Sequence, residues 1–379
     1  MGKYETLILY LIVELIALFF MYMSNGKKIV MREIGNNNKI SRNEFFIIIS
    51  FGILFLLLAL RDNVGADYLR YVELYDQIGM DTLNINEKEW LSGSLGYWIF
   101  NRLLYYVGAS HYLMFAVMGF TTLFFFFKAI KTQSTNGAFS LYIFICFCLY
   151  YQCFNTIRQM LAIAIVFYSY RYLSENKLQK YVIYVLVAAL FHKSVLVCLL
   201  IWPIRKLKIN YETLFMYTVA GSLFFFGFDF LLNIFSHTTY VSTYINSGQY
   251  SMSFGMSTLL NFGVRLFMFV FSVCFYRETI RRNIKMIPLY NIAAICTIAQ
   301  LGAIRFNLFG RLTTYFYVIY IILLPEVFKS MEEKFSIQSR KIIRIAVFSF
   351  LAIYHFVYYF SSRGAISGGY INYQMIHII

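Results

Sequence analysis

Long apolar runs recur along the whole chain of 379 residues, and they constrain its fold more than any other feature. Helical runs of about 17–25 apolar residues match the hydrocarbon core of a bilayer, which is about 30 Å thick. Only 13% of the residues are charged, whereas soluble domains carry about 25%. No stretch shows the alternating pattern of a transmembrane barrel. We therefore expect an all-α, polytopic integral membrane protein with about ten to thirteen helical segments.

The basic residues indicate how the chain crosses the membrane. Lys and Arg, which give a net charge of +15, collect in short connections between apolar runs. Such clustering is an orientation signal, so no nucleic-acid partner is expected. Two longer connections, 61–95 and 229–257, then face outward. The expected organisation is one transmembrane domain, residues 1–379, with its N-terminus outside. By the positive-inside rule, the cytoplasmic connections are 27–44, 128–131, 171–180, 205–208, 277–285 and 329–344.

Two segments do not fit a single crossing. Segment 181–204 lies between two basic connections, so it must enter and leave on the same side. We expect a helical pair that is broken near His192, because broken helices occur at membrane depth only around enclosed or wet cavities. Segment 96–110 is short and carries Arg102, which predicts an interfacial or half-inserted helix. The remaining spans are expected near 6–23, 45–60, 112–127, 138–154, 160–173, 213–228, 258–276, 286–304, 312–328 and 342–360.

The first group of candidate site residues follows the second span. Arg61 could hold a phosphate through a two-pronged contact, and Gly65 would let the backbone turn closely. Asp67 could accept a proton from a sugar hydroxyl. The alternative is a structural loop in which Arg61 anchors the membrane interface and pairs with Asp67.

Two further groups lie in the middle of the chain. Arg158 and Gln159 stand at an outer corner between two spans, where polar side chains suit sugar or phosphate contacts. The alternative for Arg158 is an arginine that snorkels to the interface. His192 stands in the expected break and could serve as a base or a proton donor. Its alternative role is a hydrogen bond between packed helices.

The last group comes late in the chain. Arg305 and Arg311 are expected at an outer helix junction, followed by Tyr315. Arg265 lies well inside a span, where insertion scales assign an arginine a cost of about 2.5–3.5 kcal/mol. It therefore needs a backbone carbonyl, a distant acid or an anionic ligand.

Together these groups place arginines and a histidine in the outer half of the membrane, in what we expect to be one cavity. Arginines beside lipid suggest a lipid-linked phosphate or diphosphate as the ligand. The chain has no Walker loop, GxSxG, HExxH or Asp-rich glycosyltransferase motif, so a soluble nucleotide donor is not expected. The six Cys have no zinc-ligand spacing, and neither a metal nor a cofactor is expected.

The order of these motifs resembles the EpsG-like branch of the Wzy-type polysaccharide polymerases. The resemblance covers most of the chain. It rests on R-x-x-x-G-x-D-x-x-x-Y from Arg61 to Tyr71, N-x-I-R-Q-x-L-A from Asn155 to Ala162, F-H-x-S from Phe191 to Ser194, and R-x-x-x-Y-F from Arg311 to Phe316 with a later Leu-Pro.

The resemblance implies a glycosyltransferase of the bacterial inner (plasma) membrane. Such an enzyme transfers a growing glycan from undecaprenyl diphosphate to a hydroxyl of the next lipid-linked repeat unit, at the outer face. The product would be an O antigen, a capsule or an exopolysaccharide, and a chain-length regulator is a further partner to consider. On this hypothesis Arg158, Arg305 and Arg311 hold the leaving diphosphate with help from Arg265, and His192 or Asp67 is the base.

Three other functions compete with polymerisation. A flippase or transporter of lipid-linked sugars would also need basic residues in a cavity, but it should show an internal repeat, and none is visible. A glycan ligase has nearly the same chemistry as a polymerase. An O-acyltransferase would also place a histidine in the membrane, but it would not need so many outer arginines.

Overall fold

The computed structural model describes residues 2–25, 42–83, 93–236, 256–306, 309–357, 369–370 and 373–376. Helices dominate these ranges, so the expected all-α membrane fold is confirmed. Most of the basic connection 27–44 lies outside the described residues. So do residues 84–92 and 237–255 of the two expected external connections.

The chain divides into two compact units, which are described separately. Unit 1 comprises Met1–Tyr168, Val187–Lys193 and Ser336–Ile379, and unit 2 comprises Ser169–Leu186 and Ser194–Phe335. The expectation of one transmembrane domain over residues 1–379 stays a prediction.

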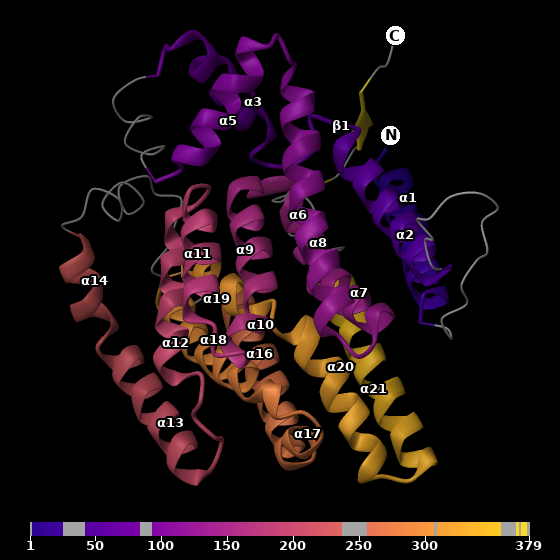
Figure 1. The fold of residues 1–379 in the computed structure, drawn as a ribbon, viewed down its shortest axis with the longest axis vertical. Helices are drawn as coiled ribbons and strands as arrows, with labels where there is room; N and C mark the ends of the chain where they lie inside the picture. Colours follow the sequence, from indigo (N-terminus) through magenta and orange to yellow (C-terminus); the bar gives the residue numbers. More distant parts are fainter. Residues whose placement is uncertain are drawn as a thin grey trace. The chain divides into compact units, whose positions relative to one another are not determined.

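Unit 1 contains the N-terminal helices and the last long helix (Figure 1). A short antiparallel strand pair, β1 (Arg61–Asp62) with β2 (Gln374–Met375), joins the end of the second helix to the C-terminal residues. The helices that lie wholly or mostly in this unit are α1 (Lys3–Met23), α2 (Arg42–Ala59), α3 (Tyr68–Met80), α5 (Leu95–Tyr106), α6 (His111–Gln133), α7 (Gly137–Cys146), α8 (Leu149–Asn155), α9 (Ile157–Ser169) and α21 (Ile337–His355).

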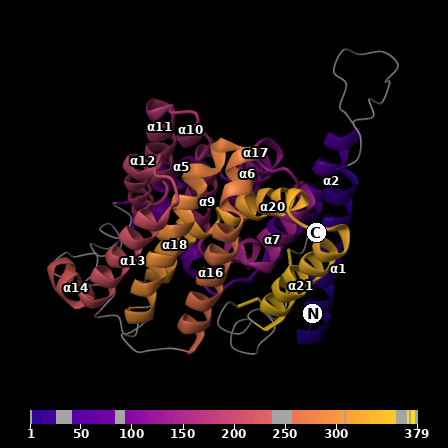
Figure 2. The ribbon, with the colours of Figure 1, turned by 90° about the horizontal axis from the view of Figure 1, so that it is seen from below.

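Unit 2 is built around one buried helix, α18, which packs against α13 and α16 (Figure 2). The elements that lie wholly or mostly in this unit are α10 (Arg171–Ser174), α11 (Leu178–Ala189), η1 (Lys193–Leu200), α12 (Ile201–Ile204), α13 (Tyr211–Phe226), α14 (Phe228–Ser236), α16 (Met256–Cys274), α17 (Tyr276–Arg282), η2 (Ile284–Met286), α18 (Ile287–Arg305), α19 (Phe309–Tyr317), α20 (Tyr320–Ser330) and η3 (Met331–Glu333).

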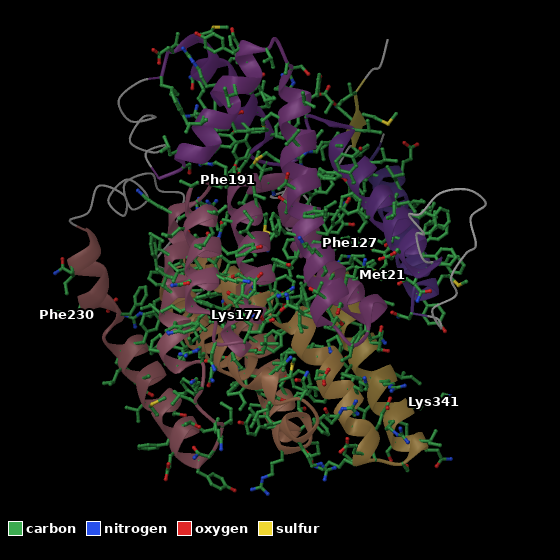
Figure 3. All side chains as sticks on the ribbon, in the orientation of Figure 1. Met21, Phe127, Lys177, Phe191, Phe230 and Lys341 are labelled. Carbon is green, nitrogen blue, oxygen red and sulfur yellow. The ribbon has the colours of Figure 1, made fainter. Side chains whose placement is uncertain are left out.

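Several helices are suited to a bilayer. Among the described residues, four are long and apolar enough to cross it, and the number rises to six if each bent pair counts as one span. Large apolar side chains are exposed on several helices: Phe215 of α13 and Phe230 of α14 are both 71% exposed. Figure 3 labels Phe230. Exposed apolar surface of this extent indicates contact with lipid rather than water.

Two of the expected spans are not single helices. Segment 138–154 is the pair α7 and α8, bent by 54°, and segment 312–328 lies in a pair bent by 44°. At the first bend Cys148 adopts a left-handed backbone with φ 56°, which ends one helix and starts the next. The residues around the two bends, 141–151 and 315–325, are all apolar or aromatic, so hydropathy alone gave no sign of the bends.

The chain breaks at His192, where the sequence predicted a broken helical pair. Helix α11 ends at Ala189, and η1 begins at Lys193. The 12 residues of α11 extend about 18 Å, which is little more than half of the hydrocarbon core. The segment expected as an interfacial or half-inserted helix is α5, which packs against α3 (Figure 1). Arg102 of α5 donates from Nη1 to the carbonyl oxygens of Ile78 and Gly79, at 2.5 and 2.7 Å.

Candidate functional site

The loop that follows α2 is hydrogen-bonded to the last residue of α8, Asn155. Asn155 Oδ1 accepts a hydrogen bond from the backbone N–H of Ala66 at 2.7 Å, and Asn155 Nδ2 donates to the Tyr370 hydroxyl at 2.7 Å. Gly65 makes this approach possible. Its φ is 115°, and a Cβ there would lie 2.6 Å from the carbonyl oxygen of Phe154. The first two sequence motifs therefore lie side by side.

Arg61 is enclosed by aromatic rings. Its side chain is 1% exposed, and the guanidinium carbon lies 4.9 Å from the ring centre of Phe154, 5.0 Å from Phe115 and 5.8 Å from Tyr68. Within the described part of the chain, its Nε and Nη1 have no hydrogen-bond partner, and it does not pair with Asp67. Burial lowers the pKa of Arg61 to about 10, so the side chain remains a cation at neutral pH.

Arg158, on the first turn of α9, is buried against the start of α5. It is 4% exposed, and its Nη1 donates to the Ser94 hydroxyl at 3.0 Å. The rings of Tyr97 and Tyr71 lie 5.3 and 6.0 Å from its guanidinium carbon. Gln159 beside it is 5% exposed. The sequence predicted a corner between two spans here, and the structure places Arg158 on a helix turn that is packed inside the unit.

The break at His192 is held by the same start of α5. The backbone N–H of Lys193 donates to the Gly93 carbonyl at 3.1 Å, and that of Gly96 donates to the Leu190 carbonyl at 2.7 Å. His192 itself is partly exposed, as is Asp67 at the N-cap of α3.

Hydrogen bonds thus connect four stretches of unit 1, residues 65–67, 93–96, 155–158 and 190–193, into one polar cluster. Two neighbouring residues are counted with it: Arg61, whose guanidinium carbon lies 4.9 Å from the ring centre of Phe154, and Gln159, which follows Arg158. The cluster contains two buried cations and two partly exposed groups that could accept a proton. We call it the unit 1 polar cluster, and it comprises Arg61, Asp67, Arg158, Gln159 and His192.

Two of the predicted residues in unit 2 are held by the fold itself. Arg265 is 7% exposed, donates from Nη1 to the Asn261 carbonyl at 3.0 Å and lies 4.1 Å from the ring centre of Tyr317. A carbonyl and an aromatic ring thus contact this buried arginine. The hydroxyl of Tyr315 is 2.9 Å from that of Ser194, which joins the F-H-x-S motif to the late motif.

The other two arginines of unit 2 that were predicted as site residues, Arg305 and Arg311, are more accessible than Arg265. Arg305 forms an ion pair with Asp229, whose side chain is 72% exposed. Arg311 is exposed on α19. The single cavity that was expected to unite these residues with Arg61, Arg158 and His192 stays a prediction.

Sequence reasoning missed a second buried polar cluster in unit 1. Glu14 of α1 accepts a hydrogen bond from the Tyr151 hydroxyl, and its Oε1 lies 3.5 Å from His355 Nε2. On the other side of the imidazole, Nδ1 lies 3.6 Å from Cys148 Sγ. All four residues are buried. The only local signal was a lone glutamate in the first apolar run and a lone histidine in the last.

The fold and the cluster define a polytopic helical membrane protein that keeps arginines buried beside a broken helix. The family comparison is more specific: the EpsG family model matches residues 44–375. The chain belongs to this family of polysaccharide-polymerase-like membrane proteins, and the resemblance expected from the motifs is confirmed. No curated protein and no solved structure matches the chain. The matched range covers every predicted site residue and begins after Glu14.

Proposed function

We propose that this protein is a polysaccharide polymerase of the bacterial inner membrane. It transfers a growing glycan from undecaprenyl diphosphate to a hydroxyl of the next lipid-linked repeat unit, at the outer face. Membership of the EpsG family supports the reaction class. The observation that carries the proposal is the unit 1 polar cluster, in which four separate stretches of chain are hydrogen-bonded around buried arginines.

Arg158 is the residue we assign to the leaving diphosphate. Its guanidinium is already fixed by Ser94 and two tyrosine rings, so little reorganisation is needed when negative charge develops. The acceptor hydroxyl oxygen attacks the anomeric carbon as the bond from that carbon to the diphosphate oxygen breaks. The electron pair leaves with the diphosphate, and in-line attack inverts the anomeric centre.

Asp67 and His192 are the two candidates for the base that takes the hydroxyl proton. Both are partly exposed and belong to the cluster, as a group that must reach a substrate should be. Arg61 and Gln159 contribute further contacts to the sugar or phosphate. Arg265, Arg305, Arg311 and Tyr315 are assigned to substrate binding from unit 2.

A deletion strain complemented with single variants tests the proposal. Arg158→Ala should remove the glycan ladder, which is the series of products with increasing numbers of repeat units, and leave one repeat unit per lipid carrier. The reason is that loss of one preorganised donor costs about 10²–10³ in rate. Arg158→Lys keeps the charge but loses the two-pronged contact, so it should restore only part of the ladder. Arg70→Ala is the control, since Arg70 lies on α3 in an exposed pair with Glu73.

The ladders also separate the competing functions, provided that each variant reaches the membrane in wild-type amounts. Absence of any unit on the outer face in the deletion strain would indicate a flippase. A lipid-linked polymer that is never attached would indicate a ligase. Unchanged ladders in Arg158→Ala, Asp67→Ala and His192→Ala would overturn the assignment of the site.

A further inference from the structure

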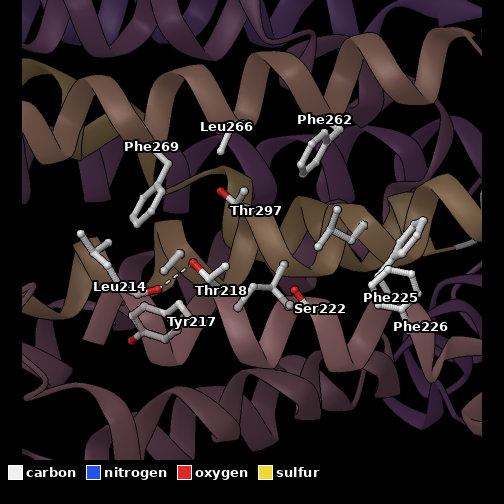
Figure 4. Close-up of a pocket in the computed structure, with 14 residues that line it drawn as sticks. Leu214, Tyr217, Thr218, Ser222, Phe225, Phe226, Phe262, Leu266, Phe269 and Thr297 are labelled. Carbon is white, nitrogen blue, oxygen red and sulfur yellow. Dashed lines mark hydrogen bonds between the residues drawn. The ribbon is translucent and has the colours of Figure 1, made fainter. Parts of the chain in front are cut away.

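A groove lies on unit 2 between α13, α16 and α18, which pack beside one another (Figure 2). Its volume is about 300 Å³. Tyr217, Phe225, Phe226, Phe262 and Phe269 surround it (Figure 4). Phe226 is 80% exposed, and apolar side chains cover the outer face of α13, so the groove belongs to surface that we expect to meet lipid.

Three of the four hydroxyl-bearing residues that line the groove are already hydrogen-bonded, and Tyr217 donates to Asn291 Oδ1 at 2.7 Å. Thr218 donates to the Leu214 carbonyl at 2.9 Å, and Thr297 donates to the Ala293 carbonyl at 3.1 Å. The lining therefore presents mainly hydrocarbon and aromatic surface. Such a surface suits an apolar chain and offers little to a sugar.

One end of the groove carries a cation. Leu301 lines the groove, and Arg305 is one helical turn further along the same face of α18. The guanidinium carbon of Arg305 lies 5.4 Å from the ring centre of Phe225, another lining residue. Its partner Asp229 is largely exposed, and exposed pairs are weak, so an anionic group could replace that carboxylate.

We propose that this groove binds the first isoprene units of a polyprenyl phosphate, with Arg305 on the phosphate that joins them. The identity of the lipid rests on the proposed function, while the apolar groove with a basic end comes from the geometry. An apolar cavity of about 150 Å³ accommodates benzene, which has six heavy atoms, so the groove of about 300 Å³ is roughly twice that size. It holds about ten heavy atoms, which is two five-carbon isoprene units.

The size of the groove gives a test that needs no turnover. The wild-type protein in phosphatidylcholine nanodiscs is titrated with polyprenyl monophosphates of one, two, three and four isoprene units. Affinity should rise at least about tenfold from one unit to two and change less than about threefold from two to four. Simple partition into the bilayer would instead strengthen apparent binding with every added unit.

Variants of α13 test the location. Ser222→Phe fills the groove and should weaken binding of the two-unit phosphate at least about tenfold. Ala220→Phe is the matched control, because Ala220 is exposed on the same helix and does not line the groove. Asp229→Asn removes the competing carboxylate and should tighten binding about threefold.

Three results would overturn the inference: a steady rise in affinity with chain length, equal binding by Ser222→Phe and Ala220→Phe, or equal competition by phosphatidylglycerol. The last would identify an ordinary lipid contact. These failures would leave the Arg158 ladder result untouched. Conversely, if the protein is not a polymerase, the distribution of glycan chain lengths in the variants would show it. The dependence of lipid affinity on the number of isoprene units would not change.

Discussion

Two buried ionisable residues of unit 1, Glu14 and Arg61, differ in whether the described residues supply polar partners for them. Glu14 receives a hydrogen bond from Tyr151 and lies beside His355, so the fold supplies the polar groups around this acid. Arg61 is equally buried, but it is surrounded by rings, and two of its nitrogens have no hydrogen-bond partner within the described residues. The first arrangement stabilises the packing of α1, α8 and α21. The second leaves a cation ready for an anion that none of the described residues provides.

Removal of the acid should have the largest effect on stability. Glu14→Ala removes the acceptor of the buried Tyr151 hydroxyl and the carboxyl group beside His355, and each buried polar group that loses a hydrogen-bond partner costs about 1–3 kcal/mol. Thermal unfolding of the purified protein measures this loss. Glu5→Ala on the exposed first turn of the same helix is the control. Equal melting temperatures for the two variants would contradict a stabilising role for Glu14.

Substitution of Gly65, in the turn between Arg61 and α3, should have the next largest effect on stability. Gly65→Ala puts a Cβ against the Phe154 carbonyl at a positive φ, and strain of this kind costs about 1–3 kcal/mol. Stability and chain-length ladders should both decline. Gly263→Ala in α16 is the control, because it is helical and has open space, and it should not destabilise the protein. If Gly65→Ala changed neither stability nor glycan chain length, the contact between this loop and Asn155 would not contribute to either.

Replacement of the unpartnered cation should separate stability from activity. Arg61→Met removes a buried charge that has no acidic partner in the described part of the chain, so stability should stay within about 1 kcal/mol of wild type or rise. Polymerisation should fall at least about tenfold. In contrast, Arg102→Met loses two hydrogen bonds to carbonyls and should cost about 1.5–3 kcal/mol. A large loss of stability in Arg61→Met would make Arg61 a structural residue like Glu14.

The smallest effect on stability is expected at the exposed pair in unit 2. Asp229→Asn should change the free energy of unfolding by about 0–1 kcal/mol, because surface ion pairs are screened by solvent. Chemical denaturation in detergent at low and high salt measures it. A cost as large as that of Glu14→Ala would show that the Arg305–Asp229 pair is buried in the functional protein.

The membrane fold was predictable because hydropathy and loop charge act locally. Helices lie where the spans were expected, although two of these spans are bent pairs, and the basic clusters on either side of residues 181–204 predicted the break at His192. The bend at Cys148 was not predictable, since it interrupts a continuously apolar run with one left-handed residue. Arg158 was identified as a candidate, but its packing against Ser94 and Tyr97 required the fold. Glu14 and His355 are 341 residues apart and share no local pattern.

The most direct test of the central claim is the stoichiometry of the reaction in proteoliposomes. Purified protein is given only the lipid-linked repeat unit, and mass spectrometry counts the joined repeats and the free undecaprenyl diphosphate. The account predicts one diphosphate released for each glycosidic bond formed, with loss of both products in Arg158→Ala and retention in Arg70→Ala. Bond formation that persists at the wild-type rate in Arg158→Ala would contradict the account.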